Sequence, residues 1–350
     1  MSARTPRVIV PTMTFRRLFA LLVPLASVGT VAACGSRTGL IIPTEEPLED
    51  AGRETGMDAS ADAREEDAGE EDALPAIDVT QPPPDAPNPC PDAGDTLIYV
   101  ITEQNILLSF DPPTGMFEHI GTIACPVTGT CTAPGQPPAP ANPFSMAVDS
   151  QGIAYVVYCD GELFRVSTAT ASCEPTGFLV GQGGFPQTFG MGFSRDPNGT
   201  TETLYVAGDP GQTETVPAVL GSIDTTFALT NIGPFAPSIY GPELTGTGAG
   251  DLFAFYAIGQ ENESQTAPTA IGQIDKTNGR VIAQTPLPGV FLQDGWAFGF
   301  WGGDFYLFTA PGGSSIVTRY RPSDGSIVQV ASTPGEIVVG AGVSTCAPAR

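Results

Sequence analysis

The feature that most constrains the fold of this chain is a repeat with a period of about 50 residues. From residue 96 onward, short apolar runs recur between clusters of turn-forming residues. One run in each repeat carries a central aromatic residue, and successive aromatics are 56, 50, 50 and 51 positions apart: Tyr99, Tyr155, Tyr205, Phe255 and Tyr306. A fixed period of this size is typical of propellers and solenoids, which repeat one supersecondary unit. We therefore expect a ring or stack of similar units.

The unit is clearest in residues 294–330. Four apolar runs occur there, WAFGF, DFYLFT, SIVTRYR and GSIVQV, and Gly, Pro, Ser or Asp separates them. This pattern predicts a four-stranded antiparallel meander. In the first two runs, apolar residues fall on both sides of the strand alternation, as in strands that have another sheet on each face. The unit is thus predicted to be one blade of a β-propeller.

The order of the runs also predicts how the ring closes. The first unit begins directly with its second strand at Thr96, whereas a run of the first-strand type, VVGAGVS from Val338, follows the last full unit. This C-terminal strand is expected to complete the first blade. The prediction is an all-β propeller of five blades with four antiparallel strands each and no unpaired edge. Crowding at the axis accounts for glycines in the first strands: Gly192, Gly246, Gly299 and Gly342.

The N-terminal segment has the features of an export signal. Residues 1–39 carry five arginines and no acidic residue, and an apolar run extends from Leu18 to Val31. This run is too short to span a bilayer comfortably and is typical of a signal-peptide core. Met13 is an alternative start to Met1, because the sequence after it also has the pattern of a leader.

Directly after the apolar run, Val31-Ala32-Ala33-Cys34 resembles the lipobox of bacterial lipoproteins. The resemblance implies that residues 1–33 are removed and that lipidated Cys34 anchors the protein in a membrane. Gly35, which stands where Asp would mark retention in the inner membrane, favours the outer membrane by the same resemblance. The folded domain would then lie on the cell surface or in the periplasm. An ordinary secretory signal followed by an incidental cysteine is the alternative.

Composition divides the rest of the mature chain into two parts. Residues 34–92 are acidic and rich in Pro, with 15 acidic residues between positions 40 and 89, and are predicted to form a disordered tether because they have little apolar surface to bury. Residues 93–350 form the predicted propeller. The net charge of −24 argues against nucleic acid as a partner, because phosphate contacts require clustered Lys and Arg.

Six cysteines besides Cys34 point to disulfides in an exported protein. Cys90 precedes the first strand and Cys346 ends the closing strand, so this pair is expected to lock the ring. Cys125 and Cys131 would close a small loop. The remaining pair, Cys159 and Cys173, is predicted to lie at opposite ends of one blade, too far apart for a disulfide. Either a turn differs from this prediction or Cys159 pairs with Cys125 or Cys131.

The sequence contains few signs of catalysis. His119 is the only histidine in the sequence, which excludes a metal site with several histidine ligands, and it is predicted to lie on an outer strand. No G-x-S-x-G motif is present. We predict no cofactor, although calcium is compatible with the many oxygen ligands. Glu243 and Asp294 open first strands near the mouth of the channel, where they would line a cation site or remain solvated.

One face of the predicted propeller is suited to binding. Loops between blades and loops joining second to third strands emerge on this face, and several are long, for example 125–142 and 208–219. Long loops on a rigid scaffold are where binding sites usually lie. The candidate binding residues are the two acidic residues at the mouth and three nearby aromatic residues: Glu243, Asp294, Trp296, Phe185 and Tyr240. For the aromatic residues, packing under the loops is the alternative.

The whole chain after the leader resembles a group of uncharacterised bacterial lipoproteins with propeller-like repeats, and the match spans most of residues 95–348. The segments that carry the resemblance are CGSRTGL at Cys34, FGMGF at Phe189, ELTGTG at Glu243, AFGFWGGDFYLF at Ala297 and VGAGVSTCAP at Val339. It implies a lipoprotein and no particular activity. Our first hypothesis is a non-enzymatic binding or scaffold module for a protein or glycan partner. The alternative is a calcium-dependent propeller hydrolase or lactonase with carboxylates at the axis.

Overall fold

The computed structural model describes residues 74–77, 79, 96–132, 137–196, 201–208, 218–258 and 267–349. All of these residues belong to one unit of the chain, Ala68–Arg350. Cys34 and the predicted leader lie outside the described residues, as does Cys90. No described helix is long and apolar enough to cross a membrane.

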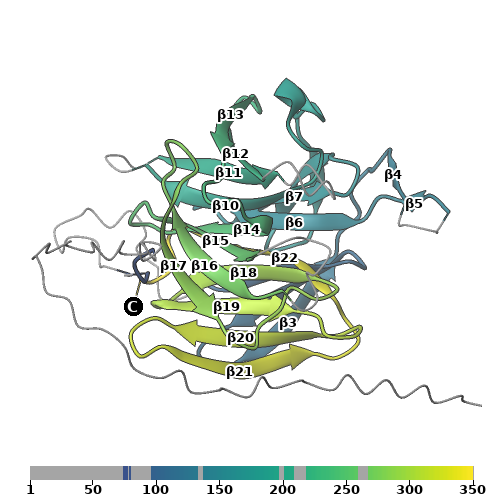
Figure 1. The fold of residues 1–350 in the computed structure, drawn as a ribbon. Helices are drawn as coiled ribbons and strands as arrows, with labels where there is room; N and C mark the ends of the chain where they lie inside the picture. The colour runs from purple at the N-terminus through teal and green to yellow at the C-terminus, as the bar shows by residue number, and fades with distance from the viewer. Residues whose placement is uncertain are drawn as a thin grey trace, which may run out of the picture. The chain divides into compact units, whose positions relative to one another are not determined.

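The described chain forms five four-stranded antiparallel sheets, which confirms the predicted five-bladed propeller (Figure 1). We number the blades in chain order and give the strands of each from the axis outward. Blade 1 contains β22 (Val338–Val343), β1 (Ile98–Thr102), β2 (Ile106–Asp111) and β3 (Met116–Thr122), and blade 2 contains β6 (Pro143–Val148), β7 (Ile153–Tyr158), β8 (Leu163–Ser167) and β9 (Cys173–Pro175).

The other three blades repeat this order. Blade 3 contains β10 (Phe189–Arg195), β11 (Glu202–Gly208), β12 (Val219–Ile223) and β13 (Leu229–Pro234). Blade 4 contains β14 (Tyr240–Gly246), β15 (Leu252–Ala257), β16 (Thr269–Ile274) and β17 (Val281–Leu287). Blade 5 contains β18 (Trp296–Trp301), β19 (Asp304–Thr309), β20 (Ser315–Arg321) and β21 (Ser326–Thr333). Between blades, a 3-10 turn η2 (Gln182–Gly184) and a short hairpin of β4 (Thr130–Cys131) and β5 (Ala139–Pro140) occur in the connecting loops.

Although β22 is the last strand in the sequence, it pairs with β1 and supplies the inner strand of blade 1. The register places Ile98 opposite Val343 and Val100 opposite Ala341. Figure 1 shows β22 in the middle of the stacked sheets, while the outer strands β13 and β21 lie at the top and bottom of the view. The N- and C-terminal strands of the propeller are therefore held in the same sheet.

The strands with apolar residues on both faces are buried as predicted. All six residues of β15 and all six of β19 are buried, because neighbouring blades cover both of their faces. At the axis, backbones approach so closely that a side chain would not fit at Gly342: a Cβ there would be 2.7 Å from the backbone N of Val148 on β6. Packing at the axis thus requires glycine at this position.

A short stretch within the range predicted as a tether, Leu74–Ile77, packs on the outer strand of blade 4. The carbonyl of Pro75 accepts a hydrogen bond from the backbone N–H of Gln284 (2.8 Å), and the N–H of Ile77 donates to the Thr285 hydroxyl (3.3 Å). Ile77 is buried in the hydrophobic cluster between blades 4 and 5. The segment therefore covers part of an edge strand that would otherwise present unpaired backbone groups.

The disulfides differ in part from the prediction. Cys125 pairs with Cys173, with their Cα atoms 5.1 Å apart, so the predicted Cys125–Cys131 bridge is wrong. Cys131 pairs with Cys159, as the open alternative allowed. The reason is that the loop after β3 packs on blade 2, where the N–H and hydroxyl of Thr128 donate to the Glu162 carboxylate, and then forms the β4–β5 hairpin. Cys346 is also disulfide-bonded, and its predicted partner is the undescribed Cys90.

Disulfides of this kind persist in oxidising compartments, which indicates an extracellular or periplasmic protein.

Candidate functional site

The strand order gives the propeller two distinct faces. The inner strands β6, β10, β14, β18 and β22 all begin at the face that carries the loops between blades, which we call the long-loop face. The opposite face carries the hairpins from first to second strands and from third to fourth strands, and we call it the turn face. On each face, described residues line a cavity in which charged side chains gather.

On the long-loop face, a cavity of about 220 Å³ opens at the axis, and we call it the axial pocket. It is lined where the inner strands begin, by residues of β6, β14, β18 and β22 and by Glu103 after β1. Three carboxyl groups and two aromatic rings contribute to its wall: Glu103, Glu243, Asp294, Phe144 and Trp296. The structure thus brings together three of the five residues that the sequence suggested for binding.

Glu243 is the deepest of the three acids. Its side chain is buried, its Oε2 accepts a hydrogen bond from the Ser145 hydroxyl (2.7 Å), and the backbone N–H of Met191 also donates to the carboxyl group. Burial raises the pKa of Glu243 well above its usual value, and the two hydrogen bonds offset this only partly. The carboxyl group of Glu243 is therefore harder to ionise than an exposed carboxyl group.

We expect a Glu243→Gln variant to lose part of the pH dependence of folding. A carboxyl group with a pKa raised in the folded state contributes a stability that is complete below the unfolded pKa and declines as pH rises toward the folded pKa. Glutamine matches the shape of the neutral acid and cannot ionise. The variant should therefore be at least as stable as the wild type at pH 8, as measured by urea unfolding at pH 4, 6 and 8.

Glu243→Ala is the comparison for this prediction. It leaves the Ser145 hydroxyl without its acceptor and opens a cavity, so it should be less stable than the wild type at every pH. Equal loss of stability between pH 4 and 8 in the wild type and in Glu243→Gln would contradict the assignment of this pH dependence to Glu243.

The other wall residues are held by backbone contacts. The Trp296 indole N–H donates to the carbonyl of Gly241 (2.8 Å), which fixes the half-buried ring at the start of β18. The N–H of Asp294 donates to the carbonyl of Ala310 (3.2 Å), and the N–H of Glu103 donates to that of Ile337 (3.0 Å). Asp294 is exposed at the mouth, whereas Glu103 is partly covered.

Two of the candidate aromatic residues pack in the hydrophobic core between blades and do not line the axial pocket. Phe185 is buried in the cluster between blades 2 and 3, with its ring centre 6.1 Å from that of Phe189. Tyr240 packs half-buried against the cluster between blades 4 and 5. Neither lines the axial pocket. His119 is exposed on the outer strand β3, where the sequence placed it.

Within the described ranges, no three His, Cys, Asp or Glu side chains form a group that could hold a metal ion. Glu243 and Asp294 share the axial pocket without forming such a group.

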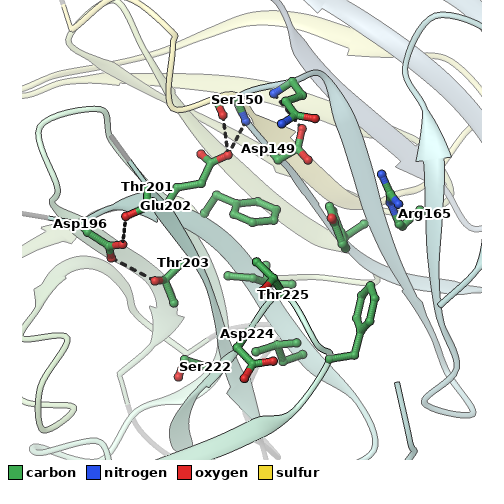
Figure 2. Close-up of a pocket in the computed structure, with 16 residues that line it drawn as sticks. Asp149, Ser150, Arg165, Asp196, Thr201, Glu202, Thr203, Ser222, Asp224 and Thr225 are labelled. Carbon is green, nitrogen blue, oxygen red and sulfur yellow. Dashed lines mark hydrogen bonds between the residues drawn. The ribbon is translucent and has the colours of Figure 1, made fainter. Parts of the chain in front are cut away.

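A larger cavity of about 740 Å³ lies on the turn face between blades 2 and 3, and we call it the inter-blade cleft (Figure 2). Figure 2 shows Asp149 and Glu202 on one side, Asp224 and Thr225 across from them, and Arg165 on a third side. Glu202 ties the two blades together, because its Oε1 accepts hydrogen bonds from the N–H and hydroxyl of Ser150, both 2.7 Å long.

The remaining carboxylates of the cleft are also fixed in turns. Asp149 is buried, and its Oδ1 accepts hydrogen bonds from the N–H groups of Gln151 and Ile153 (2.9 and 2.8 Å). Burial raises the pKa of Asp149 in spite of these two bonds. The sequence did not mark this cleft as a site. One signal for the cleft is visible when the repeats are aligned. Asp224 and Asp275 occupy equivalent positions, but the next residue is Thr225 in one repeat and Lys276 in the other.

No protein-family model matches this chain, and no curated protein matches it in sequence. Among solved structures, it is similar to a chain of a nidogen/laminin complex (11% identity, 72% of this chain and 99% of that chain, TM-score 0.43). It is also similar to TolB from Acinetobacter baumannii (14%, 68% and 53%, 0.37) and virginiamycin B lyase from Staphylococcus aureus (15%, 69% and 71%, 0.33). Similarities this low carry no information on ligand or activity.

Proposed function

We propose that the protein is an exported, lipid-anchored propeller that binds a partner protein without catalysis, and that its axial pocket receives a basic side chain of that partner. The observation that supports this proposal is the composition of the pocket wall. It contains three carboxyl groups and two aromatic rings, and no Lys, Arg or His is among the described residues that line it.

The chemistry of such a wall suits a cation. Acidic groups at the mouth of a concave site attract positive charge, and their field is focused by the low-dielectric wall around them. A Lys ammonium or Arg guanidinium would also lie against the Trp296 ring, the aromatic side chain that binds cations best. The buried carboxyl group of Glu243 would offer a hydrogen-bonding oxygen at the base of the pocket.

The test uses the fluorescence of Trp296. The chain has two tryptophans, so Trp301→Phe leaves Trp296 as the only one. Titration with acetyl-Gly-Lys-Gly-amide and acetyl-Gly-Arg-Gly-amide should change its emission in a saturable way. A peptide with norleucine in place of Lys has the same apolar stem without the charge and should produce no such change.

The matched variant for this test is Glu103→Gln/Asp294→Asn, which keeps the shape of the pocket wall and removes two charges near its mouth. We expect it to weaken binding of the basic peptides at least about tenfold, which corresponds to about 1.4 kcal/mol. A saturable response to the norleucine peptide, or equal affinity in the variant, would refute the proposal.

The anchor is a separate part of the proposal and rests on the sequence around Cys34. In bacterial cells, the wild type should fractionate with membranes and Cys34→Ser should not, because acyl chains contribute about 0.8 kcal/mol per buried methylene. Incorporation of labelled palmitate into the wild type alone would identify the modification. Membrane association of Cys34→Ser would contradict it.

A further inference from the structure

The repeats allow the inter-blade cleft to be compared with the equivalent position one blade further on. The turn after the third strand reads Ile223-Asp224-Thr225 in blade 3 and Ile274-Asp275-Lys276 in blade 4. Both aspartates close the turn in the same way, since Asp224 Oδ1 accepts from the N–H of Thr226 (2.8 Å) and Asp275 Oδ1 from that of Thr277 (2.9 Å). Thr225 and Lys276 therefore occupy equivalent positions.

Between blades 3 and 4, the Lys276 side chain fills the space next to this turn. Its ammonium donates hydrogen bonds to the Ser194 hydroxyl (3.1 Å) and to the Arg195 carbonyl (2.9 Å), and it lies 5.6 Å from the centre of the Tyr205 ring. Asp196 and Asp251 interact favourably with its charge. The propeller thus contains a built-in example of an ammonium group held between two blades by acceptors and an aromatic face.

Between blades 2 and 3, the same surroundings are present without the lysine. Tyr155 corresponds to Tyr205. Asp149 and Ser150, which directly follow β6, correspond to Ser194 and Arg195 at the end of β10. The residue that would supply the ammonium is Thr225, whose side chain is short and exposed. The space is an open cavity of about 740 Å³, within the range of small-molecule pockets.

The charge of the inter-blade cleft also suits an ammonium group. Four carboxylates line it and one described cation, Arg165, accompanies them. Arg165 extends from β8 of blade 2 and lies 6.0 Å from the centre of the Tyr155 ring. In the described part of the chain, the ion pairs within 4.0 Å involve Asp304 and not Asp149. The cleft is therefore acidic, and the substitution of a carboxylate for the Ser194 hydroxyl makes its acceptor stronger than the one that holds Lys276.

We propose that the inter-blade cleft is a second binding site, for a small aliphatic diamine. One ammonium group takes the position of the Lys276 ammonium, between Asp149, the Ser150 carbonyl and the Tyr155 ring. The alkyl chain lies against the apolar floor formed by Phe193 and Phe227, and the second ammonium group faces the carboxylate of Asp224. This site is on the opposite face from the axial pocket and does not depend on the function proposed there.

The test is isothermal titration of the oxidised protein with cadaverine, a diamine with five methylenes. All proteins carry Glu103→Gln/Asp294→Asn, so that an amine bound in the axial pocket does not contribute. The parent should bind one equivalent in a saturable way. Thr225→Lys should bind at least about tenfold more weakly, because its own ammonium fills the site as Lys276 does at the next interface.

Three further measurements make the test specific. Ser323→Lys adds the same charge to an exposed turn of blade 5 and should bind like the parent. Asp149→Asn keeps an acceptor for the turn but loses the charge, so it should also bind at least about tenfold more weakly, even if Thr225→Lys does not fold. Pentane-1,5-diol, which has the same length and no charge, should not bind.

The proposal is overturned by any of three results. These are the absence of saturable binding of cadaverine up to about 10 mM, equal affinity in the parent, Thr225→Lys and Asp149→Asn, and binding of the diol as strong as that of the diamine.

Discussion

A Gly342→Val variant is expected to unfold at a much lower temperature than the wild type or to fail to accumulate as folded protein. Gly342 lies on the inner strand β22, and a Cβ at this position would be 2.6 Å from Val148 Cγ2, 2.7 Å from Val148 N and 2.8 Å from the Ala147 carbonyl carbon. Two of these atoms belong to the backbone of β6, which cannot move without disturbing the next blade. Overpacking costs about 1–3 kcal/mol, and because two of the atoms in the way are backbone atoms we expect the upper end of this range, about 3 kcal/mol.

The measurement is thermal unfolding by circular dichroism. For a domain of this size, a loss of about 3 kcal/mol corresponds to a midpoint about 6–12 °C lower. Gly177→Val is the matched control, because a Cβ there would meet only Phe227 Cδ2 at 3.8 Å, an ordinary contact. If Gly342→Val unfolded at the same temperature as Gly177→Val, the close approach of β22 to β6 would be refuted.

Removal of the Cys125–Cys173 disulfide by Cys125→Ser/Cys173→Ser should also have a large effect. The bridge closes a loop with a sequence separation of 48, for which chain entropy gives about 4 kcal/mol. It ties the connection between blades 1 and 2 to the outer strand β9. The same connection leads into β6, whose Phe144 lines the axial pocket, so loss of the bridge should loosen one wall of that pocket.

This prediction is checked by denaturant unfolding under oxidising conditions. The variant should lose about 4 kcal/mol, and Cys131→Ser/Cys159→Ser about 3.5 kcal/mol, because its loop is shorter, with a separation of 28. Dithiothreitol should lower the stability of the wild type below that of either double variant. A double variant as stable as the oxidised wild type would mean that its bridge does not constrain the unfolded chain.

The sequence alone was sufficient to predict the blades. Strand alternation, turn residues and the period of the aromatics are local signals, and each blade is a meander of residues close together in the chain. The first strands of four blades carry a glycine, as expected from crowding at the axis, whereas the first strand of blade 2, β6, has none. Asp294 could be placed at the channel mouth because it directly precedes the first strand β18, whereas Glu243, expected to open its strand, lies within β14 and is buried.

Only the tertiary structure decided which side chains from different blades meet. Cys131 and Cys159 pair because the loop after β3 packs on blade 2, a path that no local pattern encodes. Leu74–Ile77 packs on β17 although its surroundings in sequence are acidic, because the edge of blade 4 offers apolar surface and unpaired backbone groups to it. Phe185 packs between blades whereas Trp296 lines the axial pocket, a difference that depends on loop paths rather than composition.

The inter-blade cleft also combines a feature visible in the sequence with one that only the tertiary structure decides. The change from Lys276 to Thr225 is visible when the repeats are aligned, but its consequence is an interface between blades whose facing residues lie about 50 or more positions apart. The sequence therefore determined the repeating unit, because hydrogen bonding and alternation within a blade are local. The tertiary structure decided the cavities, because the inter-blade cleft depends on how completely the side chains of two neighbouring blades fill the space between them, and the axial pocket depends on residues of four blades.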